Sequence, residues 1–267
     1  MRKILVIGIG AGNPEHLTVQ AIQAMNRAQV FFLLDKGADA GELVALRETI
    51  LKRFMRTTDY RLVRAKSPKR ELPDEPSGGY RAGVEAWHRA RAELFAALIA
   101  QELPEDGTGA ILVWGDPALY DSTLRVLAAA QAAGSVAFET EVIPGISAAQ
   151  ALCAAHKIVL NTIGDPVIIT TGRRLAQDYP KGNATVVVML DDGTGLAALL
   201  ARVKAGELER PLHIHWGAYL GTKDEMLVAG RLDEVGPGIV SARTDARARK
   251  GWVMDIYLLR GQMVPTG

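Results

Sequence analysis

The sequence lacks the features that would mark a disulfide scaffold, a metal site or a nucleic-acid binder. Cys153 is the one cysteine among 267 residues, so an internal disulfide is excluded. The five histidines form no cluster with the spacing of zinc ligands, and no metal is expected. The formal net charge is +1, which gives no case for a polyanionic nucleic-acid partner.

Long apolar runs are also missing. The chain begins with basic residues, but the apolar run that follows, residues 4–9, is too short for a secretory signal. No apolar segment has the length that a bilayer-spanning helix needs. Hydrophobic residues make up 48% of the chain and charged residues 23%, a balance typical of a packed soluble protein. We therefore expect a soluble, cytoplasmic protein.

What the sequence does contain is an alternation of buried strands and helices. This alternation runs to about residue 161 and predicts a largely parallel sheet. Beyond residue 162 strands come more densely, and one clear helix, residues 196–204, interrupts them. The predicted fold class is α/β with two α/β domains: residues 1–161 form the first, with a largely parallel sheet, and residues 162–267 form the second, with a mixed sheet.

One loop is a candidate ligand site. Gly115, Asp116 and Pro117 follow an apolar strand, and open α/β sheets bind ligands just beyond the carboxyl ends of their strands. Gly115 lets a ligand approach the main chain, and Pro117 fixes the turn and removes a donor. The loop offers carbonyls and one carboxylate, which suit a ligand with hydroxyls or a positive charge. The alternative is a plain connecting turn.

A second glycine-rich loop raises a different interpretation. The segment of residues 8–14 resembles a dinucleotide-binding fingerprint, and the strand after it ends at Asp35, where a ribose-binding acid would sit. However, Asn13 takes the place of the third glycine and Pro14 follows it, so the close contact between helix and strand is lost. A nicotinamide-dependent oxidoreductase is therefore disfavoured, although it stays an alternative.

Three segments, each between a predicted strand and a predicted helix, together resemble the motifs of the tetrapyrrole methylase family. They are residues 6–14, 115–120 and 142–148. The resemblance covers nearly the whole chain. It implies an enzyme that uses S-adenosylmethionine and yields S-adenosylhomocysteine. It also implies that cofactor and tetrapyrrole substrate lie in the cleft between two α/β domains of a homodimer.

Five further segments narrow the resemblance to members of the family that act in aerobic cobalamin biosynthesis. They are residues 30–37, 114–125, 170–175, 216–221 and 254–260. The implied reaction converts precorrin-5 to precorrin-6A by methylation of ring carbon C-1 with release of acetate. The alternatives are a methylase of the same fold that acts on another acceptor, and a tetrapyrrole carrier without catalytic activity.

The resemblance also implies which residues hold the cofactor. They are Gly10, Ala11, Trp114, Gly115, Asp116, Leu119, Ser147, Ala148, Met189 and Leu220. Asp116 is the first catalytic candidate, because its carboxylate suits a position near the positive sulfonium or the substrate ring. Asp35 and Tyr120 are the other two, Asp35 as a base and Tyr120 as a hydrogen-bonding group. For Met189, a core position at a strand end is an equally good interpretation.

The substrate would carry many carboxylates, which arginine binds with two parallel hydrogen bonds. The candidates in loops are Lys36, Arg125, Arg173, Arg174 and Lys223. The pair Arg173 and Arg174 is favoured because it follows a strand end, although exposed arginines are commonly only solvated.

Release of acetate needs a base that takes a proton from water. The sequence leaves Asp35, Asp121, His215 and a positioned water without a base as open possibilities. Tyr120 and Tyr219 are candidates for hydrogen bonds to the substrate, and a packed tyrosine is the alternative for each.

Overall fold

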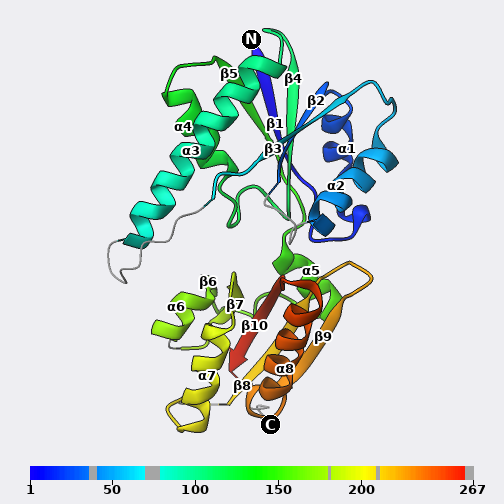
Figure 1. Ribbon diagram of the computed structural model, residues 1–267. Helices are drawn as coiled ribbons and strands as arrows, with labels where there is room; N and C mark the ends of the chain where they lie inside the picture. The colour runs from blue at the N-terminus through cyan, green and yellow to red at the C-terminus, as the bar shows by residue number, and fades with distance from the viewer. Residues whose placement is uncertain (36–40, 70–78, 180–181, 209–210, 262–267) are drawn as a thin grey trace. The chain divides into compact units, whose positions relative to one another are not determined.

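The computed structural model describes residues 1–35, 41–69, 79–179, 182–208 and 211–261. The chain divides into two compact units, Met1–Ser147 and Ala148–Gly267, both drawn in Figure 1. In the described part of the chain, no helix is long and apolar enough to cross a membrane.

The sheet of the first unit is parallel throughout, with the strand order β3-β2-β4-β1-β5. Its strands are β1 (Arg2–Gly8), β2 (Val30–Asp35), β3 (Arg61–Lys66), β4 (Thr108–Val113) and β5 (Phe138–Ile143). The prediction of a largely parallel sheet is confirmed. Because parallel strands need crossover connections, helices cover both faces of this sheet.

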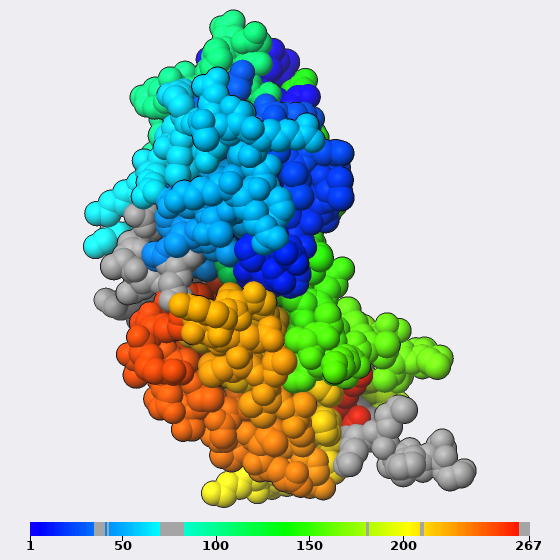
Figure 2. Space-filling model, turned by 90° about the vertical axis from the view of Figure 1, so that its right-hand side faces the viewer, coloured from blue at the N-terminus to red at the C-terminus, as the bar shows by residue number. Residues whose placement is uncertain are grey.

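The helical segments of this unit are η1 (Pro14–His16), α1 (Val19–Met25), α2 (Gly41–Phe54), α3 (Gly79–Glu102) and α4 (Thr123–Ala132). Figure 1 shows α1 and α2 on one face of the sheet and α3 and α4 on the other. Successive β1 residues therefore enter different cores: Ile4 lies in the core under α3 and α4, and Leu5 in the core under α1 and α2. Figure 2 shows α2, in light blue, beside the dark-blue segment that holds η1.

The second unit has a mixed sheet, as the sequence predicted, with the order β6-β7-β10-β8-β9. Its elements are α5 (Ala148–His156), β6 (Val167–Thr171), α6 (Gly172–Gln177), β7 (Thr185–Met189), α7 (Thr194–Lys204), β8 (Leu212–Ala218), β9 (Met226–Arg231), α8 (Leu232–Lys250) and β10 (Asp255–Gly261). Trp216 and Tyr257 are buried in the core that this sheet forms with α6, α7 and α8.

The division between the units falls earlier than the boundary that the sequence suggested between residues 161 and 162. The second unit already begins at Ala148, because α5 packs against β8, β9 and β10. Figure 2 shows α5, in green, against the orange β9. His156 Nε2 of α5 also donates a hydrogen bond to the carbonyl oxygen of Trp216, at 2.9 Å.

The prediction that one clear helix interrupts the second half was wrong. Helix α8 has 19 residues, and it runs through Gly236, Pro237 and Gly238, which disfavour a helix. Packing outweighs this preference at Gly236, where an added Cβ would lie 2.4 Å from Leu200 Cδ2 of α7. The glycine thus allows α7 and α8 to approach closely, which a sequence pattern does not reveal.

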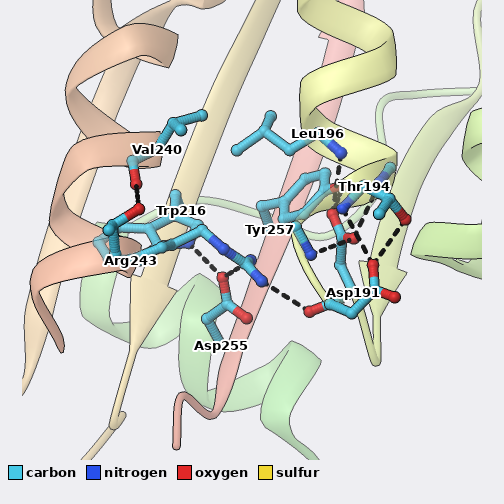
Figure 3. A network of polar contacts seen from close by, with 12 residues as sticks. Asp191, Thr194, Leu196, Trp216, Val240, Arg243, Asp255 and Tyr257 are labelled. Atoms are coloured by element: carbon cyan, nitrogen blue, oxygen red, sulfur yellow. Dashed lines mark hydrogen bonds and ion pairs between the residues drawn. The ribbon is translucent and has the colours of Figure 1, made fainter. Parts of the chain in front are cut away.

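A buried polar network connects the strands and helices of the second unit (Figure 3). Its centre is Asp191, which follows β7 and is only 8% exposed. The Asp191 carboxylate accepts hydrogen bonds from the amides of Gly193 (2.9 Å), Gly195 (3.0 Å) and Leu196 (2.9 Å), and from the hydroxyl of Tyr257 (2.7 Å). It thereby holds the start of α7 against β10, because these amides have no partner within the helix.

Arg243 of α8 closes the network from the other side. Its guanidinium pairs with Asp255 and donates to the carbonyl oxygen of Asp191 at 2.7 Å. Trp216 Nε1 also donates to Asp255, at 2.6 Å. Burial raises the pKa of Asp255 to about 6 despite the nearby arginine. Because all these partners belong to the packed unit itself, the network is structural.

Candidate functional site

The candidate site lies at the carboxyl edge of the first sheet. The connection that leaves β1 goes to α1 on one face, and the connection that leaves the neighbouring β4 goes to α4 on the other. Such a reversal between adjacent strands leaves a crevice where open α/β sheets bind ligands. The glycine-rich loop of residues 8–14 follows β1, and the loop of residues 115–117 follows β4, so both begin at this point.

A short antiparallel bridge joins the two loops. Gly115 N donates to Gly10 O at 2.8 Å, and Gly10 N donates to Gly115 O at 3.3 Å. Both glycines have positive φ angles, 79° at Gly10 and 68° at Gly115, in the region that glycine adopts at little cost. The sequence predicted both as cofactor-binding residues, and the structure brings them together.

A third loop, which follows β5, is held against the first two by close backbone contact. A Cβ added to Gly145 would lie 2.2 Å from Gly115 O and 2.8 Å from Gly8 Cα. A Cβ added to Gly8 would lie 2.6 Å from Gly145 N. Three loop backbones therefore meet at a point that has no room for side chains. Gly8 and Gly145 lie in the segments that resembled family motifs, but the sequence did not show that they touch.

The carboxylate of Asp116 ties two of these loops together. Its Oδ1 accepts from Ala118 N and its Oδ2 from Gly145 N, both at 2.8 Å. The first bond shapes the loop after β4, and the second connects it to the loop after β5. The structure thus gives Asp116 a positioning role, and the catalytic role predicted for it stays a prediction.

Several predicted residues of the first unit lie around this edge with different exposure. Ala11 and Ser147 are buried, and Trp114 and Leu119 are half-buried. Tyr120 has a φ of 52° and is 42% exposed, and partial burial raises the pKa of its hydroxyl.

Asp35, Lys36 and Arg125 are the remaining candidates of the first unit. Asp35 is the last residue of β2, and its side chain, like the whole of Lys36, lies outside the described residues. Arg125 is exposed on α4 and lines a groove between α3 and α4.

In the second unit, predicted residues gather at one edge of the sheet. Met189, at the end of β7, pairs with Thr171, which directly precedes α6. Arg173 and Arg174 are exposed in the first turn of α6, and therefore lie at the same edge as Met189.

Two more predicted cofactor residues belong to this unit, and one of them, Leu220, lies at the same edge, because β8 runs parallel to β7 and Gly217 stands level with Met189 across Ile256 of β10. Ala148 is the first residue of α5 and is half-buried. Leu220 follows β8 and is buried next to Gly217, where an added Cβ would lie 2.7 Å from Leu220 Cδ2.

The residues weighed as bases or substrate contacts have specific surroundings. Burial and the nearby His156 and His213 lower the pKa of His215 to about 4, so its ring is neutral near pH 7. The His215 ring centroid is 5.3 Å from that of His156 and 5.1 Å from that of His213. The Tyr219 hydroxyl donates to Trp252 O at 2.6 Å, which favours a packing role.

Sequence reasoning missed two arginines of the first unit, the half-buried Arg47 and the buried Arg91. Both line a cavity at the carboxyl edge, together with Asp121. A signal for Arg91 was present, since it falls on the otherwise apolar face of the helix at residues 80–103. A charged residue at a core-facing position is unusual unless it has a partner or a function.

Comparisons with known proteins identify the family to which the chain belongs. The profile of the family described as Tetrapyrrole (Corrin/Porphyrin) Methylases matches residues 3–236. A relative from Sinorhizobium sp named precorrin-6A synthase (deacetylating) is 50% identical over 260 residues, which cover 97% of this chain and 95% of the relative.

Solved structures are similar over nearly the whole chain as well. The crystal structure of a cobalamin synthesis related protein (CobF) from Corynebacterium diphtheriae has a TM-score of 0.79 and 37% identity, and the match covers 98% of this chain and 99% of that one. Uroporphyrin-III C-methyltransferase from Thermus thermophilus, in complex with S-adenosylhomocysteine, has a TM-score of 0.56 and 19% identity, with 97% of each chain covered. This second likeness shows a shared fold.

The family profile spans both units, and the relative from Sinorhizobium sp is half identical over nearly its full length. The glycine-rich edge of the first unit is built from the three segments whose resemblance the sequence already showed. The chain therefore belongs to the tetrapyrrole methylase family.

Proposed function

We propose that this methylase converts precorrin-5 to precorrin-6A in aerobic cobalamin biosynthesis. It would transfer a methyl group from S-adenosylmethionine to ring carbon C-1 and release acetate. The observation that carries the proposal is the 50% identity to precorrin-6A synthase (deacetylating) over 97% of the chain. A substrate change between such close relatives would require differences at the site.

The residues at the carboxyl edge fit S-adenosylmethionine. When bound, this cofactor supplies a methyl group that is already electrophilic because it is attached to a positively charged sulfur. The loops that meet at Gly10 and Gly115 have no side chains at their contact, and Pro117 contributes no amide donor. Carbonyl oxygens and the Asp116 carboxylate match a cation with ribose hydroxyls better than they match a phosphate.

The main task of the chain in methyl transfer is alignment. The acceptor is an electron-rich ring carbon, so the protein has to hold donor and acceptor in line and exclude water. Correct orientation of two reactants alone can contribute ~7–11 kcal/mol to lowering a barrier. The close contact of Gly8, Gly115 and Gly145 supports this role, because it fixes three loop backbones relative to one another.

Acetate release adds a hydrolytic step. Water adds to the acetyl carbonyl and a base takes its proton. The bond between this carbonyl carbon and the macrocycle then breaks, its electron pair stays with the conjugated macrocycle, and acetate leaves. Asp35, Asp121 and His215 stay the candidate bases. The lowered pKa of His215 leaves its ring unprotonated near neutral pH but also makes it a weak base, which disfavours it among the three. By resemblance to the family, we also expect a homodimer, which light scattering after size-exclusion chromatography would test.

The proposed function is tested by anaerobic turnover of precorrin-5 with methyl-labelled S-adenosylmethionine. Product mass and free acetate are followed together. We expect label in the macrocycle and one acetate for each methyl group transferred. Label in the macrocycle without free acetate would contradict the proposed acetate release. If the folded protein binds S-adenosylhomocysteine but leaves precorrin-5 unlabelled, the methyl acceptor is a different molecule.

Asp116→Ala is expected to weaken S-adenosylhomocysteine binding and lower turnover. It removes the acceptors of Ala118 N and Gly145 N, and a lost hydrogen bond to a charged group typically costs about 1.5–3 kcal/mol. Asp116→Asn keeps one acceptor and should lie between the wild type and Asp116→Ala. Calorimetry of S-adenosylhomocysteine binding measures the effect. If both variants bind S-adenosylhomocysteine with wild-type affinity, the hydrogen bonds of Asp116 do not position the cofactor.

The double variant Arg173→Ala and Arg174→Ala tests the proposed substrate contact in the second unit. Loss of two exposed cations at the edge beside Met189 should raise the KM for precorrin-5 about tenfold. A tenfold change corresponds to ~1.4 kcal/mol of binding free energy. The affinity for S-adenosylhomocysteine should stay nearly unchanged. Steady-state kinetics distinguish a change in the KM for precorrin-5 from a change in cofactor affinity. An unchanged KM would mean that other residues bind the substrate carboxylates.

A further inference from the structure

A cavity of about 110 Å³ lies between the carboxyl ends of β2 and β4. The two strands pair at Val30↔Gly109 and Phe31↔Ala110, while both continue beyond that point. The cavity occupies the space where this pairing stops. It is lined by Leu33, Leu34, Leu112 and Val113 of the strands and by three charged residues, Arg47, Arg91 and Asp121.

Arg91 has a guanidinium group that is buried but only partly satisfied. The residue is 7% exposed, on the face of α3 that packs on the sheet. Its Nη1 donates to Ser122 Oγ at 2.6 Å, and the guanidinium lies 4.7 Å from the centre of the Trp87 ring. Its Nε is buried and has no hydrogen-bond partner among the described residues. Buried polar atoms almost always have a partner, so this donor indicates a missing acceptor.

Arg47 reaches the same cavity from α2. Its Nε donates to Leu112 O at 3.0 Å, and its Nη1 donates to Leu43 O at 2.9 Å. These acceptors are neutral carbonyls, so they orient the guanidinium without balancing its charge. Burial lowers the pKa of both Arg47 and Arg91, which shows that the surroundings oppose the two positive charges.

The charges around the cavity do not balance. Among the described residues, Asp121 is the carboxylate whose charge acts on both arginines, and its Oδ1 already accepts from Thr123 N at 2.6 Å. Two guanidinium groups against one carboxylate leave one positive charge. Arg91 is buried, while Arg47 and Asp121 are half-buried, and an unbalanced charge that is partly removed from solvent is costly and favours one more anion.

We propose that this cavity binds one carboxylate side chain of the tetrapyrrole substrate, held by Arg47 and Arg91. The inference rests on the proposed function for the identity of the substrate. A volume of about 110 Å³ holds roughly three waters at ~30 Å³ each, which is enough for a carboxylate and its adjoining methylene. The guanidinium group of arginine suits a carboxylate best, because it can donate two parallel hydrogen bonds to it.

The position of the cavity explains why a carboxylate contact here would matter. Val113 lines the cavity, and Trp114 and Gly115 follow it directly in the chain. A side chain anchored at Arg91 would therefore hold the macrocycle next to the loop predicted to bind the cofactor. The contact would fix the orientation of the ring toward the methyl donor.

The experiment compares Arg91→Met and Arg47→Met with Arg89→Met, a change at an exposed arginine two positions before Arg91 on the same helix. Each cavity variant should raise the KM for precorrin-5 at least tenfold, while S-adenosylhomocysteine affinity changes less than twofold. Arg91→Met should leave the melting temperature unchanged or higher, because it removes an unbalanced buried charge. Arg89→Met should change none of these quantities.

A second measurement needs neither precorrin-5 nor methyl transfer. Propionate should bind the wild-type protein in a titration followed by NMR, and the neutral propionamide should not. Propionate binding should be lost in Arg91→Met and kept in Arg89→Met. Where turnover is measured, propionate should compete with precorrin-5.

The outcomes separate this inference from the proposed function. If precorrin-5 is not methylated but propionate binds and depends on Arg91, the proposed function is wrong and the carboxylate site stands as a site for another acid. If precorrin-5 is methylated with an unchanged KM in both cavity variants, the inference is overturned. The inference is also overturned if the wild-type protein does not bind propionate. It is overturned as well if the protein binds acetate while the cavity variants keep the wild-type KM for precorrin-5, because the cavity would then be a site for the acetate product.

Discussion

Gly145→Ala should lower kcat/KM for methyl transfer at least a hundredfold. The added Cβ would lie 2.2 Å from Gly115 O, a backbone atom that a side-chain rotation cannot move away. The loop after β5 and the loop after β4 must therefore separate. Misplacement of reacting groups by about 1 Å is enough to cost roughly 100-fold in rate.

The matched control for this variant is Gly41→Ala. Gly41 begins α2 in the same unit, and a Cβ there would meet nothing within 4 Å. We expect wild-type kinetics for Gly41→Ala and a clear loss of S-adenosylhomocysteine affinity for Gly145→Ala, measured by calorimetry on folded protein. Wild-type affinity in Gly145→Ala would show that the cofactor binds away from the glycine edge.

Asp191→Ala should destabilise the second unit by about 3–5 kcal/mol, the range for removal of one member of a buried charged network. Three main-chain amides at the start of α7 and the Tyr257 hydroxyl would lose their common acceptor (Figure 3). Arg243 would keep its pair with Asp255 but lose the network that fixes the carbonyl of residue 191. Denaturant unfolding measures the free-energy change.

The neighbouring aspartate provides the control. Asp192 is exposed, and its carboxylate accepts local hydrogen bonds from the amide of Thr194 at 3.0 Å and from its hydroxyl at 2.6 Å. Asp192→Ala should therefore cost about 1 kcal/mol, similar to the loss of a side-chain hydrogen bond at a helix start. Equal losses for the two aspartates would mean that the buried network adds no more stability than the exposed hydrogen bonds of Asp192 do.

These two pairs of variants separate a glycine that shapes a ligand site from a carboxylate that stabilises a core. Gly145 acts on the positions of three loops at a candidate ligand site, and its replacement should affect binding more than stability. Asp191 acts on the packing of α7 against β10, and its loss should affect stability first.

The α/β class, the parallel and mixed sheets and the family could all be predicted from the order of the amino acids. Strand and helix periodicity depends on neighbouring residues, and so do the glycine and proline signals that mark the loops. Gly10, Gly115 and Asp116 could therefore be placed at strand ends from the local pattern of residues alone. The resemblance of three short segments then narrowed the chemistry to methyl transfer.

Contacts between residues that are distant in the chain became visible in the folded molecule. Helix α8 forms across Gly236, Pro237 and Gly238 because it packs on α7 and the sheet, and local preference predicted the opposite. The second Asp116 bond goes to Gly145 on another loop, so it could not be read from the Gly-Asp-Pro pattern. Contacts of this kind depend on the folded chain, and no local pattern encodes them.

The two cavity arginines illustrate the same limit. A charge on an apolar helix face gave a signal at Arg91, but Arg47 looked like an ordinary residue of an amphipathic helix. Their convergence on one cavity with Asp121 follows from the parallel order of β2 and β4, which brings α2 and α3 to the same sheet edge from opposite faces. Each charge is a property of the sequence, whereas the unbalanced sum of charges arises only when the fold withdraws them together from solvent.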